Sequence, residues 1–218
     1  HANSAFGENA LMNNAAANNS AFGAWALDPN TSGTDNVAVG YQALTDNTTG
    51  GNNVGVGYLA LWKNTTGFYN SAGGEGALGR NTSGNRNTAV GNAALLYTTT
   101  ANSNTATGVN SLMNNTTGSY NTATGDRALR DNTTGIRNIA IGYAAYDGAD
   151  TESNNLAIGY DALGGAIAGG EYNIAIGNYS LDANTSGDNN VSVGYNALTA
   201  NTTGSYNTAS GSEALKAN

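Results

Sequence analysis

Short apolar segments recur along this chain with a period of seventeen residues. Each segment ends in a glycine, and successive glycines are 17 residues apart except for one gap of 16 and one of 18. An asparagine stands four residues before each glycine, and a leucine stands four residues after it except where Tyr146 takes its place. The thirteen glycines are Gly7, Gly23, Gly40, Gly57, Gly74, Gly91, Gly108, Gly125, Gly142, Gly159, Gly177, Gly194 and Gly211. A unit this short cannot bury its own apolar residues, so we expect neighbouring units to stack.

The unit that begins at Asn36 shows what each repeat is expected to form. Residues 36–39 are rich in β-branched side chains, which is typical of a strand, and residues 47–50 have the composition of a turn. The segment 41–44 alternates enough to predict a second short strand, and the unit is too short for a strand plus an α-helix. The sequence therefore predicts an all-β protein, a β-solenoid of thirteen 17-residue coils stacked about 4.8 Å apart. Because the repeat runs from end to end, we expect a single elongated repeat domain over residues 1–218.

Alternation along the predicted strand assigns its two faces. Alanine stands in the middle of most strands, as at Ala38, and larger residues flank it. We expect the alanine to face a narrow core that it shares with the leucine row. That row includes Leu44, Leu61, Leu112, Leu129 and Leu198. The flanking residues would form an apolar stripe larger than a monomer exposes, and three parallel chains would cover it. We therefore expect a homotrimer whose seam includes Val37, Val39, Ile139, Ile141, Ile174 and Ile176.

The repeat core Asn-[Ser/Thr/Val/Ile]-Ala-[Val/Ile]-Gly is seen at residues 87–91 and, with serine in the middle, at residues 190–194. This pattern resembles the head repeats of trimeric autotransporter adhesins, and it is similar to repeats in the shafts of phage tail fibres and other secreted bacterial fibres. The resemblance covers almost the whole chain. It implies a parallel homotrimeric β-solenoid that forms an elongated fibre. The unit is longer than that of adhesin heads by its Ala-Leu and Asn-Thr-Thr-Gly elements, which favours the tail-fibre branch.

The resemblance implies a non-enzymatic structural and adhesive segment, the head or shaft of a trimeric adhesin or tail fibre. Its location would be extracellular, at a cell surface or on a virion, and its partner would be a cell-surface glycan or protein receptor. The chain begins without methionine and stops about halfway through its last unit. We therefore expect it to be a fragment of a longer fibre protein.

The amino-acid composition of the chain argues against some classes of binding partner. Charged residues make up only 10% of the chain, and 7 basic against 15 acidic residues give a net charge of -8. Such a balance repels a phosphate backbone, so we expect no nucleic acid partner. No stretch approaches the roughly 20 apolar residues that span a bilayer, so we expect no direct membrane insertion. The chain has no cysteine, so stacking alone must stabilise it.

The residues needed for catalysis are not grouped in this sequence. The only histidine is His1, and carboxylates such as Glu8, Glu75, Asp126 and Glu213 are scattered over separate repeats. We therefore predict no enzyme, no cofactor and no metal, and a polysaccharide-active enzyme is the least favoured alternative. The main alternative is an ice-binding β-solenoid. It is suggested by the threonine pairs at Thr105 and Thr107 and at Thr122 and Thr124, although Val and Ile occupy these positions in most other repeats.

Two groups of residues are candidates for ligand contact. Aromatic side chains beside Asn and Thr suit sugar rings, and Tyr and Trp are enriched at binding hot spots. The candidate aromatic surface comprises Trp25, Trp62, Phe68, Tyr69, Tyr120 and Tyr206. The tyrosines that follow the repeat glycine, such as Tyr41 and Tyr58, are expected to stack in pairs. The second group is a loop that replaces the usual turn with three carboxylates, Asp147, Asp150 and Glu152. It would contact a receptor or hold Ca²⁺, or would simply be a solvated acidic loop.

Overall fold

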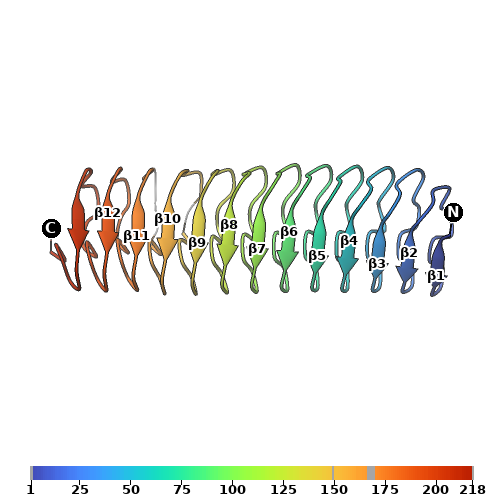
Figure 1. The fold of residues 1–218 in the computed structure, drawn as a ribbon, viewed down its shortest axis with the longest axis horizontal. Coiled ribbons are helices and arrows are strands. Elements are labelled where there is room, and N and C mark those ends of the chain that lie inside the picture. The colour runs from blue at the N-terminus through green and yellow to red at the C-terminus, as the bar shows by residue number, and fades with distance from the viewer. Residues whose placement is uncertain (1, 149, 166–169, 218) are drawn as a thin grey trace. The chain divides into compact units, whose positions relative to one another are not determined.

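The structure is a computed structural model that describes residues 2–148, 150–165 and 170–217. The chain forms two compact units, His1–Val109 and Asn110–Asn218. The described residues of both units are all-β and contain no helix. Each coil contributes one three-residue strand, and the strands of a unit pair in parallel in the order of the sequence, so each unit is a parallel β-solenoid (Figure 1).

The first unit contains seven strands in seven successive coils. They are β1 (Ser4–Phe6), β2 (Ser20–Phe22), β3 (Val37–Val39), β4 (Val54–Val56), β5 (Ser71–Gly73), β6 (Thr88–Val90) and β7 (Thr105–Thr107). Equivalent residues pair, as Val37 does with Val54 and Val39 with Val56. This register places each column of the seventeen-residue repeat in one line along the unit, so identical side chains form ladders.

The second unit continues the same pattern with six strands. They are β8 (Thr122–Thr124), β9 (Ile139–Ile141), β10 (Leu156–Ile158), β11 (Ile174–Ile176), β12 (Val191–Val193) and β13 (Thr208–Ser210). The 18-residue gap between β10 and β11 does not shift the register, because Leu156 still pairs with Ile174 and Ile158 with Ile176. The additional residue is therefore accommodated between these strands. The sequence of this longer repeat contains a glycine-rich segment at residues 164–170, for which contact with a receptor is a prediction. Residues 166–169 of that segment lie outside the described residues.

The predicted second strand is wrong, because the segment after the repeat glycine forms turns in every described coil. In the third coil the Ala43 amide donates to the Gly40 carbonyl at 3.4 Å, and Gln42 has a φ of +52° at the third position of that turn. Leu44 is also left-handed, with a φ of +55°. Its amide donates to the Ala60 carbonyl of the next coil at 3.0 Å. The coil thus keeps its hydrogen bonds to the neighbouring coil at this segment while its backbone changes direction. An extended strand would not allow this change of direction.

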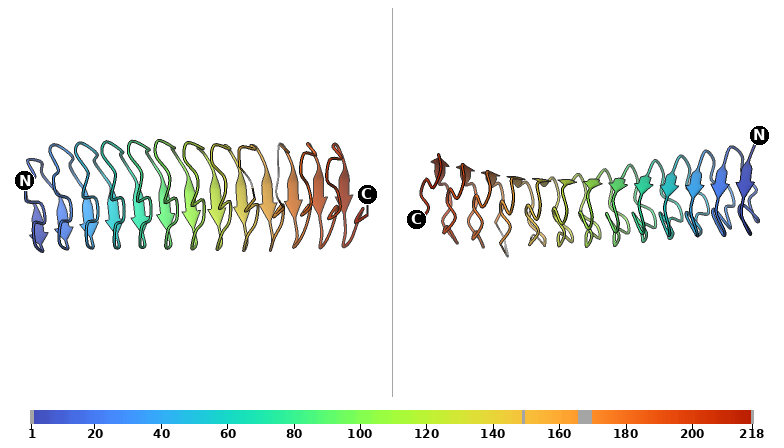
Figure 2. Two further views of the ribbon diagram at one scale, coloured as in Figure 1. Left: turned by 180° about the vertical axis from the view of Figure 1, so that it is seen from behind. Right: turned by 90° about the horizontal axis from the view of Figure 1, so that it is seen from below.

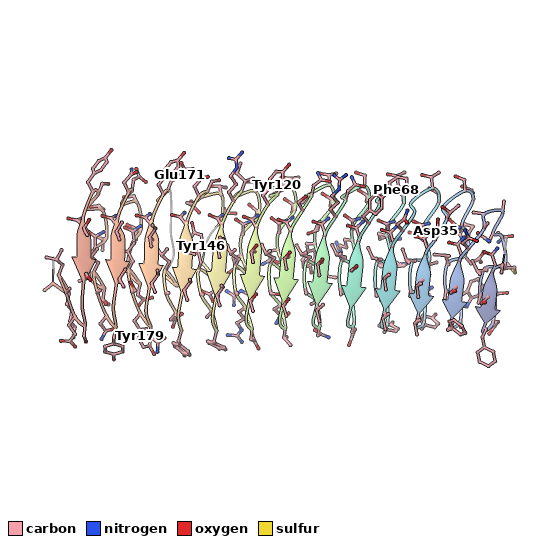
Figure 3. The ribbon with its side chains drawn as sticks, in the orientation of Figure 1. Asp35, Phe68, Tyr120, Tyr146, Glu171 and Tyr179 are labelled. Atoms are coloured by element: carbon pink, nitrogen blue, oxygen red, sulfur yellow. The ribbon has the colours of Figure 1, made fainter. Side chains whose placement is uncertain are left out.

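The core of each coil is narrow and is filled by alanine and leucine. The middle strand residue is buried in twelve strands, and the described exception is Ala5 in the terminal strand β1. The predicted core residues Leu44, Leu61, Leu112, Leu129 and Leu198 are all fully buried. Tyr146 stands in the leucine column and is also fully buried; its hydroxyl accepts a hydrogen bond from Asn155 Nδ2 at 2.5 Å. Figure 3 shows Tyr146 inside its coil beside the strand.

Two asparagine ladders cross the interior of the stack. In the ladder at the strand entrance, the Asn70 amide donates to Asn53 Oδ1 at 2.9 Å, and Asn70 Nδ2 donates to the Gly84 carbonyl at 2.8 Å. In the ladder at the Asn-Thr-Thr-Gly turn, Asn64 Nδ2 donates to Asn47 Oδ1 at 2.8 Å. The described asparagines of both ladders are almost all buried. Buried polar groups are normally paired, and in these ladders neighbouring coils satisfy most of each other's polar groups. The exceptions among the described residues are Asn81 Oδ1 and Asn132 Oδ1 of the turn ladder, which are buried without a hydrogen-bond partner.

Candidate functional site

The outward residues of the strands are aliphatic in β3, β4 and β9 to β12, whereas β7 and β8 carry threonine there. In β3, Val39 is 36% exposed and Val37 is half-buried, while Ala38 between them is fully buried. In β9, Ile139 and Ile141 are 41% and 40% exposed, and Ile174 and Ile176 of β11 are half-buried. Figure 2 shows, in its right-hand view, the strands along one side of the coils and the turn segments on the other. The predicted seam residues are therefore the side chains that point away from each coil's own core.

A groove of about 500 Å³ lies on the turn segments of the first unit. Its lining residues are Asp46, Trp62, Lys63, Thr65, Arg80, Thr82 and Thr99. The Lys63 ammonium is 4.0 Å from the centroid of the Trp62 ring and 2.8 Å from Asp46 Oδ2. The Arg80 guanidinium lies 4.7 Å from the centroid of the Tyr97 ring, and it forms no ion pair with any described residue. We call this site the cationic groove.

The register of the repeat brings the residues of the cationic groove together. Asp46, Lys63, Arg80 and Tyr97 are each six residues after a repeat glycine, so they occupy one column on four successive coils. Thr65, Thr82 and Thr99 form a second column, in which Thr65 Oγ1 donates to the Thr82 carbonyl at 2.8 Å. Sequence reasoning selected Trp62 but missed Lys63, Arg80 and Tyr97. Alignment of the repeats by column would have found them, because these side chains are unlike those at the same position elsewhere.

The six predicted aromatic residues occupy four columns of the repeat: Trp25 is two residues after a repeat glycine, Trp62 five, Phe68 eleven, and Tyr69, Tyr120 and Tyr206 twelve. Phe68 and Tyr69 lie together, with ring centroids 6.4 Å apart, and line a hollow of about 300 Å³ with Asn85 and Arg86. Trp25, 37% exposed, lines neither this hollow nor the cationic groove. Tyr120 and Tyr206 are 61% and 81% exposed in the second unit. Figure 3 shows Phe68 and Tyr120 projecting from the edge of their coils where the chain returns to the strand.

The predicted stacking of tyrosines is confirmed. Tyr41 and Tyr58 stack with ring centroids 5.6 Å apart and planes 12° from parallel. Tyr143 and Tyr160 stack in the same way at 5.2 Å and 13°. These rings are exposed, and each pair joins the edges of two neighbouring coils.

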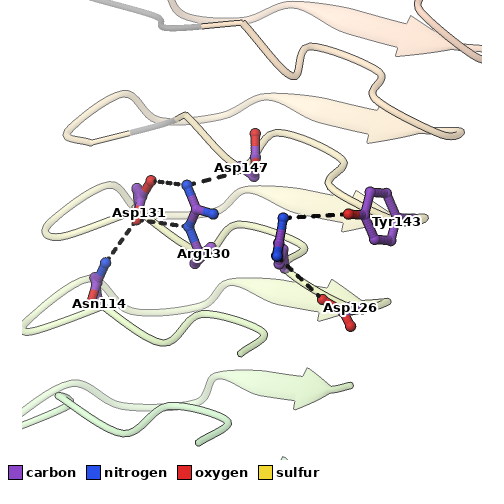
Figure 4. Close-up of polar contacts among 7 residues, drawn as sticks. Asn114, Asp126, Arg130, Asp131, Tyr143 and Asp147 are labelled. Atoms are coloured by element: carbon purple, nitrogen blue, oxygen red, sulfur yellow. Dashed lines mark hydrogen bonds and ion pairs between the residues drawn. The ribbon is translucent and has the colours of Figure 1, made fainter. Parts of the chain in front are cut away.

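The three carboxylates of the acidic loop contact different partners. Asp147 lies 3.8 Å from Arg130, which also donates to Asp131 at 2.6 Å (Figure 4). Glu152 is buried, and its Oε2 accepts hydrogen bonds from the Asp150 and Thr151 amides. The hydrogen bond from Arg130 lowers the pKa of Asp131, whereas burial raises the pKa of Asp147. The loop carboxylates are thus engaged in separate local contacts rather than directed at one point.

The described residues contain no group of three or more His, Asp or Glu side chains placed to hold a metal ion. None of the described segments forms an apolar helix of membrane-spanning length. Comparison of the chain with protein families, with curated proteins and with solved structures gave no match. The outer strand face and the cationic groove are therefore the two surfaces of the described residues that bear on function.

Proposed function

We propose that this chain is a non-enzymatic structural and adhesive segment of a homotrimeric extracellular fibre. In this proposal the coils supply rigidity and reach, and the turn faces present a surface to a receptor on another cell. The observation that carries the proposal is the apolar outer face of the strands. The resemblance of the repeat core to trimeric adhesin and tail-fibre repeats supports the same assignment.

The outer face is difficult to reconcile with a chain that functions alone. Strands β9 to β12 each place two aliphatic side chains outward, so eight such residues lie side by side on adjacent strands of the second unit. Monomeric proteins rarely expose a contiguous apolar patch of more than a few hundred Å². Parallel strands are also normally covered on both faces. Three copies around an axis would cover this face and leave the turn segments in solvent.

Sedimentation equilibrium tests the proposed trimer. We expect the parent chain to have about three times its monomer mass of 21.9 kDa. The double variant Ile139→Lys with Ile174→Lys should sediment as a monomer, because each lysine would bury an unpaired charge in the seam. Tyr206→Lys is the matched control, since Tyr206 is 81% exposed outside the strands, and it should keep the trimer mass. A parent chain that sediments as a monomer would overturn the proposal.

The ice-binding alternative has less support from the strand faces. Outward threonine pairs occur in β7 and in β8, whereas the outward residues of β3, β4 and β9 to β12 are aliphatic. A regular threonine array would need the same pair on many adjacent strands. Thermal hysteresis of the parent chain would favour this alternative over the fibre.

A further inference from the structure

We infer that the cationic groove of the first unit binds an acidic polysaccharide, through its carboxylate or sulfate groups and its sugar rings. This inference rests on the proposed adhesive function, because it names the class of receptor that the segment would bind. It depends on three features of the groove: its charge, its aromatic surfaces and its position on the coil.

The charge of the groove is opposite to that of the whole chain. The chain has a net charge of -8, and residues 1–109 contain only three basic side chains, Lys63, Arg80 and Arg86. Two of these line the groove, and Asp46 is its only acidic lining residue. Lys63 is paired with Asp46, which leaves the Arg80 guanidinium without an acidic partner among the described residues. A planar guanidinium of this kind favours a carboxylate or a sulfate, because it donates two parallel hydrogen bonds.

Aromatic rings lie beside both cations. Trp62 is half-buried next to Lys63, and the 36% exposed Tyr97 ring lies next to Arg80. The residue that follows Trp62 in its column is Gly79, which adds no side chain beside the indole. An exposed aromatic ring provides an apolar surface for the face of a sugar. The Thr65 and Thr82 hydroxyls donate to the Thr82 and Thr99 carbonyls, and each can still accept a hydrogen bond from a sugar hydroxyl. The groove thus combines apolar surfaces with an anion-binding group.

The groove extends along successive coils rather than around one of them. Its lining residues come from four coils, so a ligand must run along the column to contact all of them. A linear polysaccharide, with a repeated acidic group, has this shape. The groove also lies on turn segments. The strands, whose outward residues the proposed trimer would cover, follow the opposite side of the coils (Figure 2). It would remain open to solvent in the assembled fibre.

Binding of defined polymers to the parent chain tests the inference. The probes are hyaluronan, which carries carboxylates, heparin, which also carries sulfates, neutral dextran, and a single-stranded DNA oligonucleotide. We expect saturable binding of hyaluronan or heparin and no binding of dextran. The relative affinities for the first two identify which anionic group is preferred. Equal binding of dextran, or tighter binding of the oligonucleotide than of both polysaccharides, would overturn the inference.

Single substitutions locate the binding. Arg80→Gln and Trp62→Leu should each weaken binding of the acidic polysaccharide by about tenfold, the effect expected for loss of one charged hydrogen bond or one aromatic contact. Arg137→Gln is the matched control, because Arg137 is also exposed and without an ion pair among the described residues. It should change the affinity less than twofold. Unchanged binding in both groove variants, with unfolding midpoints equal to that of the parent, would overturn the inference.

The mass of the parent chain separates this inference from the proposed fibre. A trimer that binds none of the polymers leaves the fibre proposal standing and overturns the groove. A monomer that binds hyaluronan or heparin through Arg80 overturns the trimer and supports the groove.

Discussion

At the scale of single residues, the repeat glycines are required for two reasons: their backbone φ is positive, and the next coil leaves no room for a side chain. Gly57 has a φ of +138°, a region that side chains rarely allow. A Cβ atom added there would lie 2.4 Å from the carbonyl oxygen of Gly74, the equivalent glycine of the next coil. That contact is with backbone, so it cannot be relieved by rotation of a side chain. The regular spacing of these glycines in the sequence thus follows from close stacking of one coil on the next.

Two alanine substitutions test this requirement. Gly57→Ala should lower the free energy of unfolding by at least about 2 kcal/mol, because it adds backbone strain and a steric clash. Gly73→Ala is the control: a Cβ at Gly73 meets nothing within 4 Å, so the change should be neutral or stabilising by less than about 1 kcal/mol. Chemical denaturation of both variants measures the difference. Equal midpoints for the two would show that the glycine column is not needed for stacking.

At the scale of the coil, hydrogen-bonded asparagines connect each turn to the next. Asn70 Oδ1 accepts from both the amide and the Nδ2 of Asn87, at 3.0 Å and 3.2 Å. Asn70 Nδ2 donates in turn to Asn53 Oδ1 and to the Gly84 carbonyl. The residue is fully buried, so no water replaces a partner that is lost. The ladder therefore links three coils through one side chain.

Replacement of one ladder residue should destabilise the whole stack. Asn70→Ala leaves buried polar groups on Asn87, Asn53 and Gly84 without this partner, and we expect a loss of about 2–4 kcal/mol. Asn92→Ala serves as the control, because Asn92 is exposed and its side chain makes one contact of 3.2 Å with Glu75. That variant should change stability by less than about 0.5 kcal/mol. Thermal unfolding followed by circular dichroism compares them, and similar midpoints would contradict the role given to the ladder.

The same buried ladders restrict modification of the turns. The Asn-x-Ser/Thr triplets at Asn30, Asn47, Asn64 and Asn81 resemble acceptors for N-linked glycans. All four asparagines are fully buried, and the Nδ2 atom that would carry the sugar of Asn64 donates to Asn47 Oδ1 and the Gly67 carbonyl. Within the folded coil these positions are therefore structural.

The parts of the coil that depend on periodicity were predictable from the sequence. The alternation at Ala38 between Val37 and Val39 fixes which side chains point inward, and the seventeen-residue register fixes which of them meet. The second strand was predicted wrongly, because nothing in the composition of residues 41–44 reveals that Gln42 and Leu44 are left-handed. The cationic groove was missed for a different reason. Its residues differ in type, so they were recognised only once the register placed them in one column.

At the scale of the whole molecule, the balance of charges makes stability depend on pH. The chain is strongly acidic, with a net charge of -8, so its charges repel one another at neutral pH. In the second unit, burial together with the nearby Asp161 carboxylate raises the pKa of Asp182, and burial raises that of Asp147. The opposite holds for Asp131, whose pKa is lowered by its hydrogen bond from Arg130. Asp182 and Asp147 thus oppose folding when ionised, whereas Asp131 favours it.

The sign of the effect at Asp182 can be tested directly. A carboxyl whose pKa is higher in the folded state binds more protons there, so its contribution to stability is lost as the pH rises through the raised folded pKa. Asp182→Asn should therefore raise the unfolding temperature at pH 7 and leave it unchanged near pH 3, where the parent aspartic acid is already neutral. Asp35→Asn removes a charge from an exposed side chain and controls for the change in net charge. Calorimetry of both variants at pH 7 and near pH 3 measures these unfolding temperatures. If Asp182→Asn changes the unfolding temperature equally at the two pH values, the burial of Asp182 does not oppose folding. The same conclusion follows if its effect at pH 7 is no larger than that of Asp35→Asn.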